Sequence, residues 1–357
     1  MSEHNYMPIP PGAIIPGSLP KFKIYILSEQ GRYVLWTLEG NRVTAEQLAK
    51  LAASRHQEVF LDLDEELKYE EYLETHLGNI LENQAPSDEQ KAAIFSRVSA
   101  NVVRNAVETS LGLGAMDERA MVRTQAMVKN ALIFIAQSKS LEALTAMIGH
   151  DYKTYEHAAK VLWFTTAFLK ENPAVMEQVQ PGYQAFDAYQ RMEALRQCGV
   201  GALLHDIGKA FVSQEILNKE GPLNPVEWEA MKRHPLNGLA MLLDSDLPTF
   251  VLKAVLHHHE DFHGGGYPMG LEGLRISILA RVLRIIDCFD AMTSRRPYKE
   301  PISSLKAMQI MVGIPPDKKA DAEGRGYADR DKGMRHCFDE ELLGKFIVFL
   351  GHMKLHG

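Results

Sequence analysis

The residues best suited to chemistry lie in the stretch Leu203–Lys209, which has the sequence LLHDIGK. His205 and Asp206 offer an imidazole and a carboxylate to one metal centre, and the carboxylate has a second oxygen for another ion. Lys209 lies three residues after Asp206 and four after His205, so a helix would project its ammonium over the same site. A helix end is the alternative, because His and Lys favour the negative end of the helix dipole and Gly208 would serve as a C-cap.

Four other segments carry side chains that bind metals. They are His157 in Tyr155-Glu156-His157, His234 before Pro235, the run His257-His258-His259-Glu260 followed by His263-Gly264-Gly265-Gly266-Tyr267-Pro268, and Asp287 with Asp290. Each has an ordinary alternative, because a lone histidine is often a core residue and paired aspartates are often helix caps or solvated acids. The presence of all five segments in one helical part of the chain favours a metal centre.

Length and composition are those of a globular protein. At 357 residues the chain exceeds one comfortable core, so two domains are expected. The net charge of −7 argues against a DNA or RNA polymer as partner, and an anionic substrate would need local cations. Three widely spaced cysteines without a CxxC pair exclude a disulfide scaffold and a zinc ribbon. We expect a cytoplasmic protein without a membrane partner, since no apolar run reaches spanning length and no signal-peptide pattern occurs.

The elements before the ligand segments form a separate pattern. The proline-rich residues 1–20 are expected to be a disordered lead-in. Residues 21–85 predict a small α/β regulatory or docking domain, with strands around residues 22–26, 34–38 and 58–63 and a helix opened by the capping box Thr44-Ala45-Glu46-Gln47. A second capping box at Ser87 and Gln90 opens a helical connector over residues 86–149. Residues 150–357 are expected to be helical, so the fold class is mainly α.

The order of these motifs resembles the HD-GYP family, a branch of the HD metal-dependent phosphohydrolases. The resemblance covers roughly residues 150–350 and rests on HDIGK, HHE with GGGYP, DCFDAMTSRRPYK, and Phe338-Asp339-Glu340-Glu341-Leu342. Family members are described as bacterial signalling phosphodiesterases that open cyclic di-GMP. The resemblance therefore implies an all-helical HD-type metallohydrolase bundle over residues 150–357, preceded by the small α/β domain.

The family pattern implies a set of metal ligands for two divalent ions. They are His157, His205, Asp206, His234, His258, His259 and Asp287. Asp206 would bridge the two ions, with His157, His205 and Asp287 on one and the other three histidines on the second. His257 is left as a bystander. Ligands of nitrogen and oxygen without thiolate suit iron or manganese, although zinc, cobalt or nickel would also fit.

Two positions depart from the family pattern. Where some members carry a glutamate that supports a third metal, this chain has Lys153, whose ammonium cannot act as a ligand, so a binuclear site is expected. Where an aspartate often precedes the glycines of the GYP loop, this chain has His263, which we do not count as a ligand.

The same resemblance assigns the remaining roles. Asp206 and Lys209 would be catalytic, with Lys209 orienting the attacking water or stabilising and protonating the leaving oxygen. Arg296 and Lys299 would clamp phosphate oxygens. Tyr267 would stack on a base or bind a phosphate from a glycine-rich mobile loop, and Asp290 would support the ligands or the substrate-binding loop.

These assignments lead to a metal-dependent phosphodiesterase that converts cyclic di-GMP to linear pGpG, with slow further hydrolysis to GMP left open. Two alternatives remain: a hydrolase of another cyclic or linear dinucleotide, and a cyclic-dinucleotide sensor or interaction module with little turnover. A homodimer or a signalling partner bound through the N-terminal domain also remains open. The sequence leaves undetermined the native metal, the signal sensed by residues 21–85, and the pathway.

Overall fold

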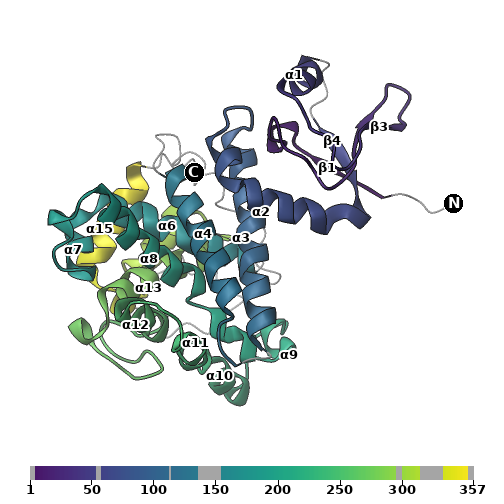
Figure 1. Ribbon diagram of the computed structural model, residues 1–357. Coiled ribbons are helices and arrows are strands. Elements are labelled where there is room, and N and C mark those ends of the chain that lie inside the picture. Colours follow the sequence, from purple (N-terminus) through teal and green to yellow (C-terminus); the bar gives the residue numbers. More distant parts are fainter. Residues whose placement is uncertain are drawn as a thin grey trace. The chain divides into compact units, whose positions relative to one another are not determined.

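The computed structural model describes residues 5–53, 58–111, 114–135, 154–294, 300–313 and 333–352 (Figure 1). The chain forms two compact units, Met1–Val98 and Ser99–Gly357. None of the helices in the described ranges combines the length and apolar character needed to cross a membrane.

The first unit is built on a four-stranded antiparallel sheet. The strands are β1 (Tyr6–Ile9), β2 (Ile24–Leu27), β3 (Tyr33–Thr37) and β4 (Val59–Asp62), in the order β1-β4-β2-β3. Helix α1 (Ala45–Ala53) begins at the expected capping box, in which the Thr44 and Gln47 side chains each accept from the other residue's backbone N–H. Helix α2 (Glu66–Glu82) follows β4 and contributes Tyr69 and Tyr72, whose rings pack edge-on against buried Phe22. The predicted strands and helix of this unit are confirmed.

The expected disordered lead-in is wrong for most of its length. Residues 6–9 form the edge strand β1, in which Tyr6 pairs with Asp62 and Ile9 pairs with Val59. An edge strand tolerates Pro8, since one side of it needs no backbone donor. Ala13 and Ile14, a few residues further on, are buried. The prolines therefore shape an ordered segment of the first unit.

The second unit consists of helices in its described residues, and the expected helical bundle is confirmed. Its helices are α3 (Asp88–Leu111, which begins in the first unit), α4 (Glu118–Ile135), α6 (Thr154–Glu171), α7 (Pro173–Val179), α8 (Ala188–Leu204), α9 (Gln214–Leu217), α10 (Pro225–Met231), α11 (His234–Leu242), α12 (Thr249–His257), α13 (Ile278–Thr293), α14 (Ser304–Met311) and α15 (Glu340–His352).

An aromatic core holds three of these helices together. Phe164 and Phe168 of α6 pack edge-on against Phe346 of α15, and Phe289 of α13 packs against both Phe164 and Phe346. All four side chains are buried. Fully burying an aromatic side chain contributes about 1.5–3 kcal/mol of stability, so this cluster fixes α6 and α13 relative to each other.

The HDIGK stretch departs from the single helix expected of it. Helix α8 begins at a capping box between Asp187 and Gln190 and ends at Leu204, and Ile207–Phe211 form a 3-10 helix. Gly208 is no C-cap: a Cβ there would lie 2.0 Å from the carbonyl oxygen of His234 and 2.4 Å from the nitrogen of Gly238. Glycine is needed because the backbone of α11 passes against this turn. The same contact brings His234 to the residues that follow α8.

Candidate metal centre

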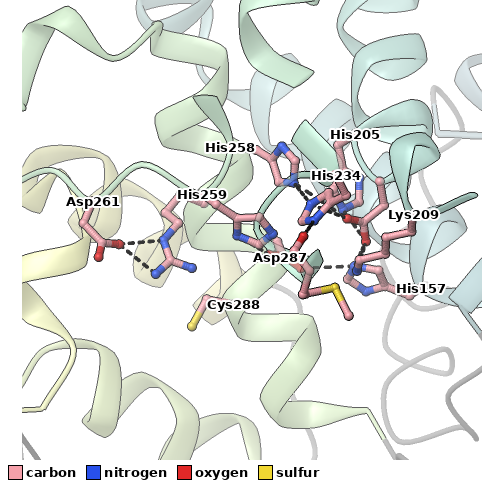
Figure 2. Close-up of polar contacts among 12 residues, drawn as sticks. His157, His205, Lys209, His234, His258, His259, Asp261, Asp287 and Cys288 are labelled. Atoms are coloured by element: carbon pink, nitrogen blue, oxygen red, sulfur yellow. Dashed lines mark hydrogen bonds and ion pairs between the residues drawn. The ribbon is translucent and has the colours of Figure 1, made fainter. Parts of the chain in front are cut away.

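The helices bring the seven proposed ligands to one place, and Figure 2 shows six of them, all but Asp206, labelled side by side. The ligand His157 lies in the first turn of α6, and Asp287 lies in α13. The remaining ligands lie at the ends of helices: His205 and Asp206 directly follow α8, His234 is the first residue of α11, and His258 and His259 directly follow α12. Six of the seven are buried and His259 is nearly so.

The ligand atoms fall into two groups. One comprises Asp206, His234, His258 and His259, and the other comprises His157, His205 and Asp287; within each group the atoms lie within 4.8 Å of one another.

The Asp206 carboxylate lies between the groups. Its Oδ1 is 3.2 Å from His234 Nε2 and 3.7 Å from His258 Nε2. Its Oδ2 is 3.3 Å from His205 Nε2 and 3.9 Å from His157 Nε2. Each oxygen therefore faces a different set of imidazoles, which is the arrangement a bridging carboxylate requires.

Four histidines are oriented by a contact of the nitrogen that faces away from the centre. In His205, His234 and His258, Nδ1 lies 2.7–2.9 Å from the backbone carbonyl oxygen three residues earlier. In His157, Nδ1 lies 2.6 Å from Asp290 Oδ2. When Nδ1 donates to that oxygen, the lone pair is on Nε2, which faces the centre. These contacts orient the four imidazoles so that Nε2 faces the centre, where it can bind a cation.

Asp290 belongs to this supporting layer. Its Oδ1 accepts a hydrogen bond from Ser294 Oγ at 2.8 Å, and Lys160 Nζ donates to the same hydroxyl at 2.9 Å. Asp290 is 2% exposed, so it lies behind His157 and out of reach of a substrate. Of the two roles that the sequence left open for Asp290, support of the ligands fits these contacts, and support of the substrate-binding loop stays a prediction. Sequence reasoning missed Lys160, although a lysine on the buried face of an amphipathic helix indicates a buried partner.

The centre fits a bound cation. The His234 and His258 Nε2 atoms face each other at 3.1 Å, within the roughly 3.0–3.4 Å expected when two imidazoles bind one ion at about 2.1 Å with an angle of about 90–109° at the ion. Within the described part of the chain, His205 Nε2 and Asp206 Oδ1 are buried without a hydrogen bond. Buried polar atoms without a partner are costly, and an ion at each group would satisfy both of them.

The electrostatics of the groups agree with that fit. Burial lowers the pKa of His258 to about 4 and that of His259 well below its ordinary value, so both are neutral at pH 7. Burial alone would raise the pKa of Asp206, but Lys209 and His205 outweigh it and hold that pKa well below the usual range. Asp287 behaves in the same way, with His157 as the main opposing group. Neutral imidazoles and ionised carboxylates are the forms that bind metals.

The amine of Lys209 lies at the edge of the centre. Its Nζ is 2.6 Å from Asp206 Oδ2, and its side chain is 21% exposed. The turn that follows α8 therefore places a cation beside the carboxylate that faces both ligand groups, and leaves part of that cation open to solvent.

Tyr267 also lies at the centre. Its ring centroid is 4.8 Å from that of His259 and 5.9 Å from that of Trp228. Burial raises the pKa of its hydroxyl, which therefore remains a hydrogen-bond donor.

The loop that carries Tyr267 is held by its own contacts. The Glu260 carboxylate accepts from the backbone N–H groups of Met269 and Leu271 at 2.7 and 2.8 Å. A Cβ on Gly266 would lie 2.2 Å from the nitrogen of Asp261, so glycine here permits a tight turn. The glycines expected to make the loop mobile include at least one that packing requires.

An ion pair beneath this loop was missed from sequence. Arg284 Nε and Nη2 donate to Asp261 Oδ1 at 3.0 and 2.7 Å. Arg284 lies one helical turn before Asp287, and Asp261 lies two residues after His259. An arginine inside the apolar run of α13 was the available signal, because a buried guanidinium requires an acidic partner.

Several predicted residues take no part in the two groups or cannot be placed. His257 is buried, but its Nδ1 accepts from the Ser277 backbone N–H at 3.3 Å. His263 is exposed, with Nδ1 3.0 Å from the carbonyl oxygen of His336. Arg296, Lys299 and Lys153 lie outside the described residues.

Comparisons with known proteins agree with the motif pattern. Residues 188–323 match the model of the HD domain. Across 223 residues the chain is 33% identical to a cyclic di-GMP phosphodiesterase of Pseudomonas aeruginosa, an alignment that covers 62% of this chain and 47% of that protein. It is 37% identical to a cyclic di-GMP phosphodiesterase of Thermotoga maritima over 42% of this chain and 37% of the relative. The chain thus spans about half, or less, of the length of these curated relatives.

Two further comparisons extend the picture. A 3'3'-cGAMP-specific phosphodiesterase of Vibrio cholerae is 39% identical over 31% of this chain and 24% of that protein. A solved structure of an HDG"Y"P protein from Bdellovibrio bacteriovorus matches with a TM-score of 0.58 and 15% identity, covering 97% of this chain and all of that one. At that identity the match bears on the fold alone. The resemblance expected from the motifs is confirmed.

Proposed function

This chain carries an HD domain, and we propose that it is a metal-dependent phosphodiesterase that hydrolyses cyclic di-GMP to linear pGpG. The observation that supports this most directly is the Asp206 carboxylate, whose two oxygens face two different groups of imidazoles. The names of the relatives support a cyclic dinucleotide as the substrate class.

In this proposal seven residues hold two divalent ions. His157, His205 and Asp287 would hold one, His234, His258 and His259 would hold the other, and Asp206 would contribute to both. Bound ions of this kind lower the pKa of a coordinated water and neutralise charge at phosphorus. The nitrogen and oxygen ligands favour iron or manganese.

The chain's own residues would orient the substrate and manage the leaving group. Lys209 places an ammonium beside Asp206, where it would neutralise charge as the phosphodiester opens and give a proton to the departing 3′-oxygen. Tyr267 would offer its ring to a base or its hydroxyl to a phosphate oxygen. Arg296 and Lys299 keep their proposed role as phosphate clamps.

A second candidate substrate is 3'3'-cGAMP. Relatives with that specificity match this chain at 38–39% identity. Both cyclic dinucleotides present the same phosphodiester ring, and none of the ligand residues distinguishes a guanine from an adenine.

Turnover under anaerobic conditions tests the proposal. The full chain is purified anaerobically, supplied with iron or manganese, and its bound metal is quantified together with the products formed from cyclic di-GMP and from 3'3'-cGAMP. Linear pGpG at about two iron or manganese ions per chain is the expected result. Faster hydrolysis of 3'3'-cGAMP would make that dinucleotide the proposed substrate and leave the proposed mechanism unchanged. Full metal loading without turnover of either dinucleotide would favour a sensor.

A further inference from the structure

A third group of ligand-type side chains lies outside the proposed catalytic centre. Asp261, His336 and Cys337 each offer one ligand atom, and these atoms lie within 4.8 Å of one another. None of the three belongs to either histidine-rich group. In Figure 2 Asp261 lies apart from the cluster that contains His205, His234 and Asp287.

We propose that Asp261, His336 and Cys337 form a separate binding site for a zinc-class ion. The chemistry of the set supports zinc, because carboxylate oxygen, imidazole nitrogen and thiolate sulfur are the three ligand types that zinc takes in proteins. The thiolate separates this site from the proposed catalytic centre, whose nitrogen and oxygen ligands suit harder ions.

The spacing of two ligand atoms is already that of a zinc site. His336 Nε2 lies 3.5 Å from Cys337 Sγ. Zinc bonds of about 2.1 Å to nitrogen and 2.3 Å to sulfur, at a tetrahedral angle, separate those atoms by about 3.6 Å. The Asp261 ligand atom lies within 4.8 Å of both of these atoms, and tetrahedral bonds would separate it from them by about 3.4–3.6 Å, so its carboxylate would move inward by at most about 1.4 Å.

The backbone holds the three residues in place. The Phe262 N–H donates to the Cys337 carbonyl oxygen at 3.1 Å, and the His263 N–H donates to the His336 carbonyl oxygen at 3.0 Å. These two bonds join the segment that carries Asp261 to the segment that carries the other two ligands. Since the scaffold exists before binding, an ion would not need to order it.

The ion pair with Arg284 orients Asp261 for this role. Both guanidinium contacts are made to Oδ1, which leaves Oδ2 outside the ion pair. Ligating carboxylates in metal sites are commonly held by such an outer hydrogen bond. Three protein ligands leave a fourth position open at the half-buried His336 side of the site.

The site would link the loop of Tyr267 to the segment that leads into α15. Asp261 lies between His259 and Tyr267 in the chain, and Cys337 lies three residues before α15. An ion held by both segments would restrain the loop next to the proposed catalytic centre, while leaving the seven catalytic ligands unchanged.

Cobalt absorption provides the test. The full chain is stripped of metal under anaerobic conditions and titrated with cobalt(II). A near-ultraviolet sulfur-to-cobalt charge-transfer band is expected to rise to the intensity of about one thiolate-bound cobalt per chain, whatever further cobalt the histidine-rich groups take up, and zinc should displace the cobalt and bleach the band. The histidine-rich groups contain no sulfur, so the band reports this site independently of activity.

Matched variants assign the band. Cys337→Ser should abolish it, and Cys288→Ser, which removes another buried thiol of the same unit, should retain it. His336→Ala, at a half-buried position, should weaken cobalt binding at this site at least about tenfold, and circular dichroism of the variant should match that of the wild type. Absence of the band from the wild-type protein, its persistence in Cys337→Ser, or unchanged affinity in His336→Ala would overturn the proposal.

Discussion

At the scale of single residues, four of the five ligand histidines have an outer partner that fixes their tautomer. Asp290 is the clearest case, because its carboxylate is buried against Nδ1 of His157 and is itself held by Ser294. The burial cost of Asp290 is offset by its contact with His157, which holds the pKa of this carboxyl below its usual range. The Asp290 carboxylate is therefore the hydrogen-bond acceptor that orients the His157 imidazole.

Asp290→Asn should weaken metal binding about 10–100-fold, because an amide is a poorer acceptor and no longer favours the tautomer with its lone pair on Nε2. Metal affinity is measured by competition with a chelator. Asp246→Asn, at an exposed aspartate before α12, provides the control and should leave affinity unchanged. Equal affinities in both variants would show that Asp290 has no part in aiming His157.

Lys209→Ala separates catalysis from metal binding. The lysine contacts Asp206 but is not a ligand, so bound metal should stay close to the wild-type value while turnover falls about 100-fold or more. Bound metal and product formation are measured on the same sample. Lys219→Ala removes a lysine that pairs with Glu227, and should keep full turnover. Strong residual turnover in Lys209→Ala would remove this lysine from the mechanism.

At the scale of elements, the centre depends on how closely the turn after α8 approaches α11. Gly208 and the His234 carbonyl leave no room for a side chain between them. In this way a glycine that binds nothing controls the position of a ligand histidine.

Gly208→Ala should destabilise the protein by about 2–3 kcal/mol and reduce metal content, because the added methyl group must push the start of α11 away. Chemical denaturation measures the first effect and metal analysis the second. Gly344→Ala on α15 is the control: its Cβ meets nothing within 4 Å, so helix propensity should stabilise the protein by about 0.5–1 kcal/mol. Normal stability and metal content in Gly208→Ala would contradict the close approach.

At the scale of the whole molecule, the buried histidines make the metal-free fold sensitive to acid. The pKa of His258 falls from 6.5 in the open chain to about 4 in the fold, with burial as the main cause. Between these values the unfolded chain binds a proton that the folded chain does not. Stability contributed by neutral His258 is therefore complete above about pH 6.5 and is lost as the pH falls toward 4.

The expected loss for this histidine is on the order of 3 kcal/mol across that window. Urea denaturation of metal-free protein at stepped pH values measures it. His258→Gln cannot titrate, so its curve should be flatter between pH 6.5 and 4 by about that amount. Parallel curves for the two proteins would show that His258 is not held neutral in the fold.

The sequence alone determined the features that local patterns carry. Alternation of apolar and polar residues predicted the strands β2, β3 and β4, and the capping residues Thr44 and Gln47 predicted the start of α1. The types of the candidate ligands were also fixed locally, since HD and HHE are short motifs with few interpretations once they occur together. Each of these features can be predicted from residues close in the chain or from one repeating pattern of side chains.

Only the tertiary structure decided which residues meet. Strand β1 escaped notice because its prolines argue for disorder until β4 is known to lie beside it. Three contacts of the site join segments that are distant in sequence. Asp206 contacts His234, Asp290 orients His157, and Arg284 pairs with Asp261. No periodicity encodes such contacts, because each depends on where packing of the helices in the second unit brings the ends of α6, α8, α11 and α12 and the inner turns of α13.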